Sequence, residues 1–241
     1  MSLLSIVQDT LKEMGGFEVP SSVVGNTNET AVRSLALVNR SIKEVAKRLD
    51  WPGLVVRGTL TTADTQEEYT LPSDFQSFMN DSMWDDTNNR QVGGPLSPSD
   101  WEYVKNSDAV ASVSSINSWF RIFRGTSTND RVFYLFPIPD SIRTLRYEYR
   151  SNALTETSGG VAQGDKYLAD TDVGLLDEDI VALGFKWRFL KTYGLPYAEE
   201  FRDYEAAIED GKNADGAPII AFTYGGLVRF GPVVPDGDFT L

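Results

Sequence analysis

Carboxylates are the most numerous side chains in this chain that could carry out catalysis. The 241 residues include 35 Asp and Glu. Two carboxylates at a set separation are enough for glycoside hydrolysis, because one acts as an acid and the other as a base or a nucleophile. The residues that could supply such a pair are Glu67, Glu68, Glu148, Asp177, Glu178 and Asp179. No pair among them is recognisable from its spacing, so we predict no catalytic residues and keep a carboxylate hydrolase as the alternative.

The chain contains no Cys and no His, which excludes several common kinds of catalytic and metal site. Without these residues the chain has no disulfide, no cysteine nucleophile, no Ser-His-Asp triad and no zinc site of nitrogen and sulfur ligands. Carboxylate, lysine, tyrosine or oxygen-ligated metal chemistry remains, as does a function in binding and assembly. We expect no cofactor and no bound metal.

A glycine-rich segment at 159–166 comes close to a phosphate-binding loop. Such a loop needs Gly-Lys followed by Ser or Thr, whereas positions 164–167 read GDKY. The carboxylate of Asp165 would repel a phosphate. We therefore interpret this segment as a surface loop.

The segment 170–174, with the sequence DTDVG, resembles the beginning of a calcium loop. Alternating carboxylates can direct several oxygens at one cation, but the twelfth position, which needs a bidentate acid, is Val181. We favour a solvated turn that leads into a helix capped at Asp177.

Apolar residues spaced three and four apart predict helices at both ends of the chain. Gly15 and Gly16 end the first helix, and Asn28 caps the second. The predicted helices cover 3–14, 29–50, 177–193 and 197–210, with a short one that begins at Ser97-Pro98 and includes Trp101 and Val104.

Between these helices, short extended segments with turn residues predict strands at 54–62, 68–71, 119–124, 131–136 and 142–150. The last three have short connections, which predicts an antiparallel meander. The segment 75–84 fits either a strand or a helix, and 151–174 has the composition of a loop.

These elements predict an α+β fold in which terminal α-helices pack as a bundle around an inserted antiparallel β domain. The helical domain comprises 1–53 and 175–215, and the mainly-β domain comprises 54–174. Residues 216–241 are predicted to form an extended C-terminal arm, because they are apolar, aromatic and rich in turn residues.

The formal net charge, 22 − 35 = −13, argues against general affinity for nucleic acid. That affinity comes from Lys and Arg that displace counterions from phosphates. An acidic wall would repel passing DNA and keep it from sticking to a channel. We expect the basic residues of 29–50 and 177–193 to pair with neighbouring acids. There is no signal-peptide pattern and no run of about 18 apolar residues, so we expect an intracellular product that does not enter a membrane.

Aromatic residues exceed what a minimal core requires, with 5 Trp, 10 Tyr and 13 Phe, and this surplus indicates interfaces. The stripe of Tyr197, Phe201 and Tyr204 favours a helix's core face over a binding surface. The candidate interface residues are Phe222, Tyr224, Phe230, Phe239, Tyr197 and Trp187.

Five short segments, in this order, resemble the head-to-tail adaptor (connector) proteins of tailed bacteriophages, over about residues 3–210. No single segment is specific, but their combined order and spacing are. They are GGFEVP at 15–20 after the first helix, RLDW at 48–51, YTLPSDF at 69–75, GPLSPSDW at 94–101, and LLDED at 175–179 before WRFL at 187–190.

The resemblance implies a virion structural protein that forms a ring between the portal and the tail or nozzle proteins and lines the DNA channel. Its partners would be the portal protein, tail or nozzle proteins, further copies of itself, commonly twelve, and passing DNA without sequence-specific binding. It would be assembled in the host cytoplasm and lie at the head-tail junction. The alternatives from the residues themselves are a glycoside hydrolase or peptidoglycan-cleaving virion protein, and a carbohydrate-binding β module.

Overall fold

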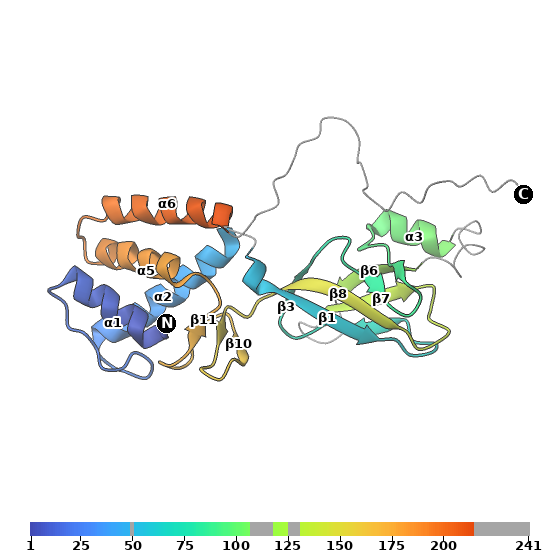
Figure 1. Cartoon of the computed structure of the whole chain (residues 1–241), viewed down its shortest axis with the longest axis horizontal. Helices are drawn as coiled ribbons and strands as arrows, with labels where there is room; N and C mark the ends of the chain where they lie inside the picture. The colour runs from blue at the N-terminus through green and yellow to red at the C-terminus, as the bar shows by residue number, and fades with distance from the viewer. Residues whose placement is uncertain (49–50, 107–117, 125–130, 215–241) are drawn as a thin grey trace, which may run out of the picture.

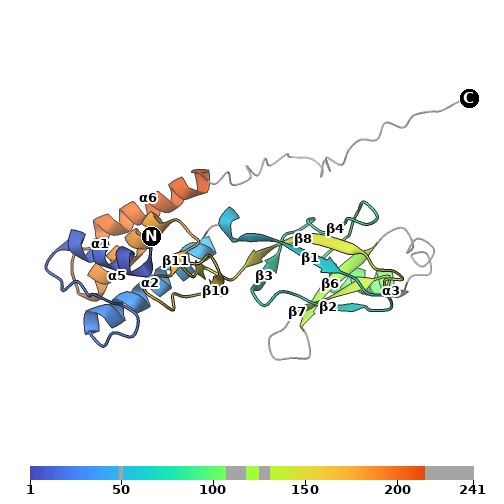
Figure 2. The same ribbon diagram turned by 60° about the horizontal axis from the view of Figure 1, so that its bottom comes forward.

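Two lobes, one mainly helical and one mainly β, make up the described part of the chain (Figure 1). The structure is a computed structural model that describes residues 1–48, 51–106, 118–124 and 131–214. The lobes are joined by a narrow connection, which is also visible after rotation (Figure 2). The chain crosses this connection twice, first near the 3₁₀ helix η1 (Pro52–Leu54) and again after strand β8 (Thr144–Ser151).

The four predicted long helices are confirmed. The first N–H groups of an α-helix have no acceptor within the helix. Side-chain oxygens of Ser2, Asn28 and Asp177 accept hydrogen bonds from such groups and cap their helices. Gly15, at φ +64°, ends the first helix with a conformation that favours glycine. These helices are α1 (Leu3–Met14), α2 (Glu29–Arg48), α5 (Glu178–Thr192) and α6 (Ala198–Ala214).

Helix α5 is the centre of the helical lobe. It packs against α1, α2 and α6, and it buries Phe185 and Phe189 completely. These two rings lie 5.5 Å apart, centroid to centroid. The other helices complete the same core with Leu3, Val7 and Leu11 from α1, Val38, Ile42 and Val45 from α2, and Tyr204 and Ile208 from α6.

A small sheet of β9 (Thr155–Glu156), β10 (Ala162–Gly164) and β11 (Val173–Gly174) lies beside these helices (Figure 1). The sequence predicts a loop here, within the mainly-β domain of 54–174. Here Leu154 and Tyr167 are buried and pack in the helical core. The division of the chain into separate folding domains stays a prediction.

The β lobe consists of two facing sheets. One has β8 at its centre, paired with β1 (Val55–Thr61), β3 (Phe75–Phe78) and β4 (Trp84–Asp85), and β4 continues to β5 (Arg90–Gln91). The other has β7 (Arg131–Phe136) between β2 (Glu68–Thr70) and β6 (Trp119–Arg124). The segment 75–84, which the sequence left open, supplies β3 and the start of β4.

The predicted meander is half right. Strands β6 and β7 pair antiparallel, but β8 leaves their sheet and pairs with β1. The reason is burial: β8 alternates buried Leu145, Tyr147 and Tyr149 with partly exposed Arg146 and Glu148. The apolar face of β8 therefore covers the face of β6 and β7 in a second layer.

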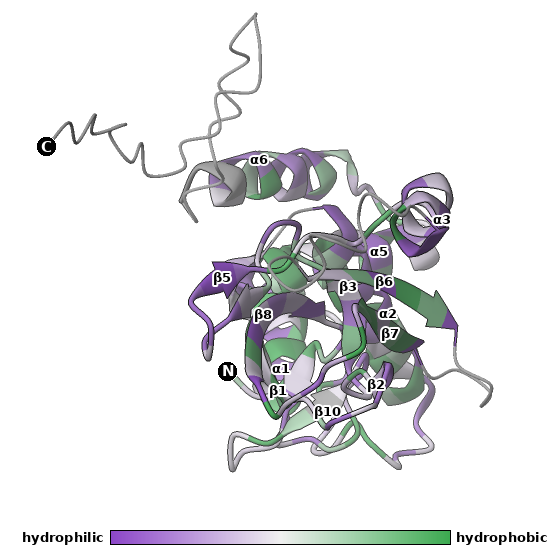
Figure 3. Ribbon diagram, turned by 90° about the vertical axis from the view of Figure 1, so that its right-hand side faces the viewer, coloured by the Kyte–Doolittle hydropathy of each residue, from purple (hydrophilic) through white to green (hydrophobic). Residues whose placement is uncertain are grey.

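Aromatic rings fill the space between the sheets. Phe120 and Phe133 are at most 1% exposed, and Tyr147 packs against Phe133 with 6.4 Å between centroids. Strands β6 and β7 are drawn largely in the hydrophobic colour (Figure 3). On their other side lies helix α3 (Pro98–Asn106), whose predicted start is confirmed and whose Trp101 ring lies 6.1 Å from Phe123.

A hydrogen bond joins the lobes at the connection, and others order the chain on either side of it. The guanidinium of Arg150 donates to the carbonyl of Ala46 at the end of α2, and Trp51 Nε1 donates to Val45 O at 2.9 Å. On the β side, Asp74 accepts hydrogen bonds from Tyr149 Oη at 3.0 Å and from Ser151 Oγ at 2.7 Å. Burial, together with this carboxylate, raises the pKa of Tyr149 to about 12.

We predict that Phe185→Ala destabilises the protein by about 3–5 kcal/mol, because it leaves a cavity in the centre of the helical core. Ile142→Ala is the matched control, since Ile142 is 71% exposed, and it should change stability by less than about 0.5 kcal/mol. Urea unfolding followed by circular dichroism measures both. Equal effects would contradict the central position of α5.

We also predict a loss of stability at alkaline pH. The folded protein holds the Tyr149 proton more tightly than the unfolded chain does, so this contribution is complete below pH 10 and disappears as pH rises from 10 to about 12. Tyr149→Phe cannot ionise, and its unfolding free energy should fall less steeply over this range. If the unfolding free energy of the variant fell as steeply with pH as that of the unmodified protein, the pKa of Tyr149 would not be raised by folding.

Candidate functional site

Two of the candidate interface residues, Trp187 and Tyr197, lie together between α5 and α6. Their ring centroids are 6.2 Å apart, and the ring of Trp187 also lies 5.1 Å from Phe201 and 6.2 Å from Tyr204. The remaining candidates, Phe222, Tyr224, Phe230 and Phe239, lie outside the described residues.

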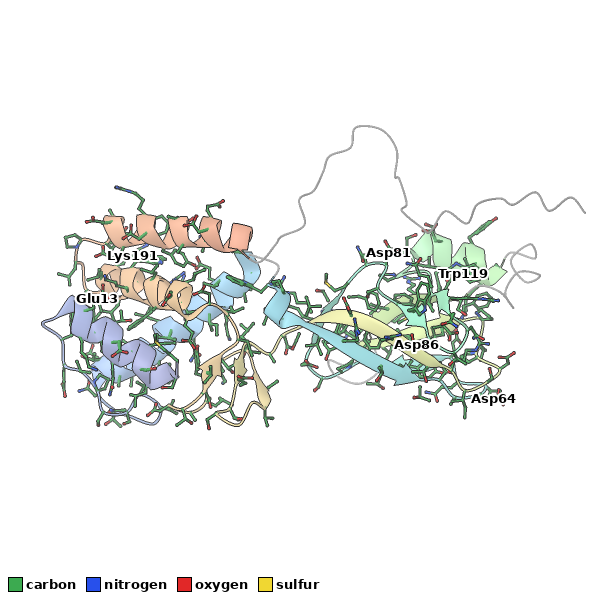
Figure 4. The ribbon with its side chains drawn as sticks, in the orientation of Figure 1. Glu13, Asp64, Asp81, Asp86, Trp119 and Lys191 are labelled. Atoms are coloured by element: carbon green, nitrogen blue, oxygen red, sulfur yellow. The ribbon has the colours of Figure 1, made fainter. Side chains whose placement is uncertain are left out.

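The turn between α5 and α6 brings these rings together. Gly194 adopts φ +69°, and the N–H of Leu195 donates to Leu190 O at 3.0 Å, which reverses the chain. Helix α6 then runs back along α5. Lys191, labelled near the outer end of this lobe in Figure 4, places its Nζ 5.7 Å from the Trp187 ring centroid and 5.6 Å from that of Tyr197.

The aromatic stripe of α6 is divided between core and surface. Tyr204 is completely buried, as a core residue should be, whereas Phe201 is 37% exposed. Leu195 and Tyr193 in the adjoining turn are exposed to a similar degree. This end of the helical lobe therefore presents an apolar surface supported by a packed aromatic core, which is the composition of an interface centre.

Arg188 is buried beneath this cluster and, as expected for the basic residues of 177–193, it pairs with an acidic residue. Only 5% of it is exposed, and its Nη1 donates to Ser41 Oγ at 3.1 Å and to Gly184 O at 2.6 Å. Its Nη2 pairs with Glu44 of α2. The guanidinium lies 4.3 Å from the Trp187 ring centroid, so it also sets the position of that ring.

Glu44 extends the same network to α6. It pairs with Arg48 at 3.2 Å, and Arg48 pairs with Glu205 of α6 at 2.5 Å. Burial opposes the charge of Arg48, but its hydrogen bond to Glu205 and the nearby acidic groups outweigh this effect and raise its pKa. The expected pairing of basic residues with acids is thus found here between helices as well as along them.

A family model described as SU10 adaptor protein matches residues 1–217, which include both lobes. The chain belongs to this family. The resemblance to phage head-to-tail adaptors is confirmed, and the protein is a structural adaptor of a bacteriophage and a component of its virion. None of the curated proteins matches the chain. Among the helices of the described ranges, none is long and apolar enough to cross a bilayer.

In this adaptor the segment 170–174, which resembles the beginning of a calcium loop, accepts hydrogen bonds from backbone N–H groups. Asp170 accepts from the N–H of Val24 at 2.8 Å, and Asp172 accepts from the N–H groups of Leu168 and Ala169, each at 2.7 Å. The preference for a turn agrees with these bonds, but the expectation that it is solvated was wrong, because Asp172 is 1% exposed. Nowhere in the described ranges do three acidic side chains gather as a metal site would require.

The glycine-rich segment of the adaptor does not have the architecture of a phosphate loop. A phosphate loop leads directly into a helix whose N-terminus faces the phosphate. Here 162–164 form strand β10, and Asp165 pairs with Lys43 of α2 at 2.6 Å. The interpretation as a surface loop agrees with the 63% exposure of Val161.

The six carboxylates that could have formed a hydrolytic pair are divided between the two lobes of the adaptor. Glu67 pairs with Lys105 at 2.5 Å, and Glu148 pairs with Arg57 at 3.2 Å. Glu68 accepts a hydrogen bond from Tyr134 Oη at 2.7 Å, which raises the pKa of that tyrosine. The other three, Asp177, Glu178 and Asp179, form the start of α5, where Asp177 is the cap.

We predict that Asp172→Ala destabilises the adaptor by about 1 kcal/mol, because the N–H groups of Leu168 and Ala169 lose the acceptor that the buried carboxylate supplies. The matched control is Asp165→Ala, whose carboxylate is exposed, and it should have little effect. Thermal unfolding measures both variants. Added calcium or a chelator should leave the midpoint of the unmodified adaptor unchanged, and a rise with calcium would reinstate a cation site.

Proposed function

We propose that this adaptor forms a ring at the head-tail junction, between the portal and the tail or nozzle proteins, and that the ring surrounds the channel through which DNA passes. The family match over both lobes is the observation that carries the proposal. In this arrangement the protein would assemble in the host cytoplasm in up to twelve copies, matching the symmetry that portals commonly have.

The helical lobe and the β lobe lie at opposite ends of the molecule, which suits a virion protein that contacts a different partner at each end (Figure 1). We assign the helical lobe to contacts around the ring and with the portal, and the β lobe to the tail side. Trp187 and Tyr197 belong to the interface of the helical lobe, whose neighbouring residues are apolar and exposed. The arm, with Phe222, Tyr224, Phe230 and Phe239, docks on a neighbouring copy or the portal by adding a strand to a sheet edge.

The net charge of −13 supports a role beside DNA without tight binding. An acidic inner wall repels the phosphate backbone, so DNA is not held as it passes. A protein that gripped DNA would instead need a basic surface that displaces counterions. The charge is therefore compatible with a conduit and unfavourable for general nucleic-acid binding.

The first test is light scattering of the purified adaptor, alone and after mixing with the portal ring of its own phage. We expect one large complex of fixed stoichiometry. Deletion of 217–241 should abolish or strongly weaken this complex while thermal unfolding of the two lobes stays unchanged.

No association under any salt condition would refute the portal contact. Unchanged binding after the deletion would refute the role of the arm alone. Incubation with cell-wall material, followed by a zymogram, tests the hydrolase alternative in parallel, and we expect no clearing.

A further inference from the structure

Helix α2 carries a basic stripe on the side opposite its core contacts. Arg40, Lys43 and Lys47 recur at spacings of three and four, whereas Val38 and Ile42 point into the helical core. Within the described ranges Arg40 and Lys47 form no salt bridge, and Lys43 pairs with Asp165. An open groove of about 510 Å³ runs along this stripe, lined by Ala36, Asn39, Arg40, Lys43, Glu44 and Lys47.

Helix α6 carries the opposite charge on its own outer side. Glu199, Asp203 and Asp210 are exposed there, with Ala206 between them. The basic residues of this helix are Arg202 and Lys212. The opposite side of α6 buries Tyr204 and Ile208. A basic stripe on one helix and an acidic stripe on another therefore occur in the same lobe.

The two stripes of one chain cannot meet each other. Both helices turn their buried sides to the same core around α5, so their outer sides face away from that core in different directions. A second copy can bring its acidic stripe to the basic stripe of the first. Its own basic stripe then remains available for a third copy.

We propose that the outer face of α6 in one adaptor docks in the α2 groove of the next. This proposal rests on the ring of the proposed function and names the surfaces that close it. Because the two surfaces differ, the contact is head-to-tail, and such contacts generate rings when the rotation closes. It also gives neighbouring copies of an acidic protein an attractive contact despite their net repulsion.

The dimensions of the two stripes agree. Arg40 and Lys47 are seven residues apart, as are Asp203 and Asp210, and seven residues of α-helix span about 10.5 Å. Ala36 lines the groove and Ala206 lies on the acidic face, so small side chains allow the helices to approach closely. Exposed ion pairs are individually weak and screened by salt, so the contact should depend strongly on ionic strength.

The lack of native cysteines makes a direct test possible, since only introduced thiols can form disulfides. Full-length Ala36→Cys and Ala206→Cys chains are mixed under mild oxidation, so that a 36–206 disulfide can form only between copies. The linked peptide is quantified by mass spectrometry. The control mixes Ala36→Cys with Thr59→Cys, which is exposed in the β lobe. We expect about tenfold more of the 36–206 product than of the control product.

Charge reversal separates specific docking from chance collision. Arg40→Glu and Lys47→Glu in the Ala36→Cys chain should lower the 36–206 yield about tenfold. Asp203→Lys and Asp210→Lys in the Ala206→Cys chain should restore it when the two reversed chains are mixed. Thermal unfolding confirms that each variant is folded.

A yield no higher than the control, or reversed chains that fail to restore it, would overturn the docking proposal. So would cross-linking that requires added duplex DNA, because the basic stripe would then be a nucleic-acid surface.

Portal binding, measured by light scattering on the same variants, is a separate readout. If the portal complex forms with its full stoichiometry while the cross-link is absent, only the docking proposal fails. If the cross-link forms without portal binding, docking is supported and the portal contact fails.

Discussion

The buried guanidinium of Arg188, which pairs with the partly exposed Glu44, is the constraint on which the helical lobe depends. A guanidinium that is 5% exposed needs a full set of acceptors, and it finds them on α2 and α5. Glu44 is shared with Arg48, which reaches α6 through Glu205. A shift of α2 against α5 would leave the buried guanidinium of Arg188 without its partners, which fixes these two helices relative to each other. The link to α6 through Arg48 and Glu205 is more exposed and therefore weaker.

This constraint has consequences at the surface. It holds Trp187 against Arg188, and through Trp187 it positions the rings of Tyr197 and Phe201 at the end of the lobe. It also fixes the directions in which the outer sides of α2 and α6 face. An assembly protein benefits from such preorganisation, since little side-chain and helix ordering remains to oppose association.

Much of the fold could be predicted because local rules determined it. Asn28 and Asp177 cap helices, Gly15 ends one, and the apolar spacing of α2 and α5 agrees with burial on one side. The partners of each strand were harder to predict than the strands themselves. The alternating pattern of β8 suits either sheet, and only the burial of Tyr147 and Tyr149 against the second layer decides which sheet it joins. The partners of Arg188 could not be predicted for a related reason: they include Ser41 and Glu44, more than 140 residues away in sequence. Of the candidate interface, the sequence located Trp187 and Tyr197 as aromatic residues, but their contact depends on the turn at Gly194.

The distribution of charge links the fold to assembly. The excess negative charge of the chain makes copies of the adaptor repel one another. Electrostatic attraction between copies needs a place where the local charge is reversed, and the α2 stripe is such a place. Arg188 and Arg48 pair with carboxylates within the lobe, whereas Arg40 and Lys47 on the outer side of α2 form no salt bridge in the described ranges and can pair with a neighbour. The internal ion pairs therefore help to determine which surface of the adaptor can receive an acidic partner.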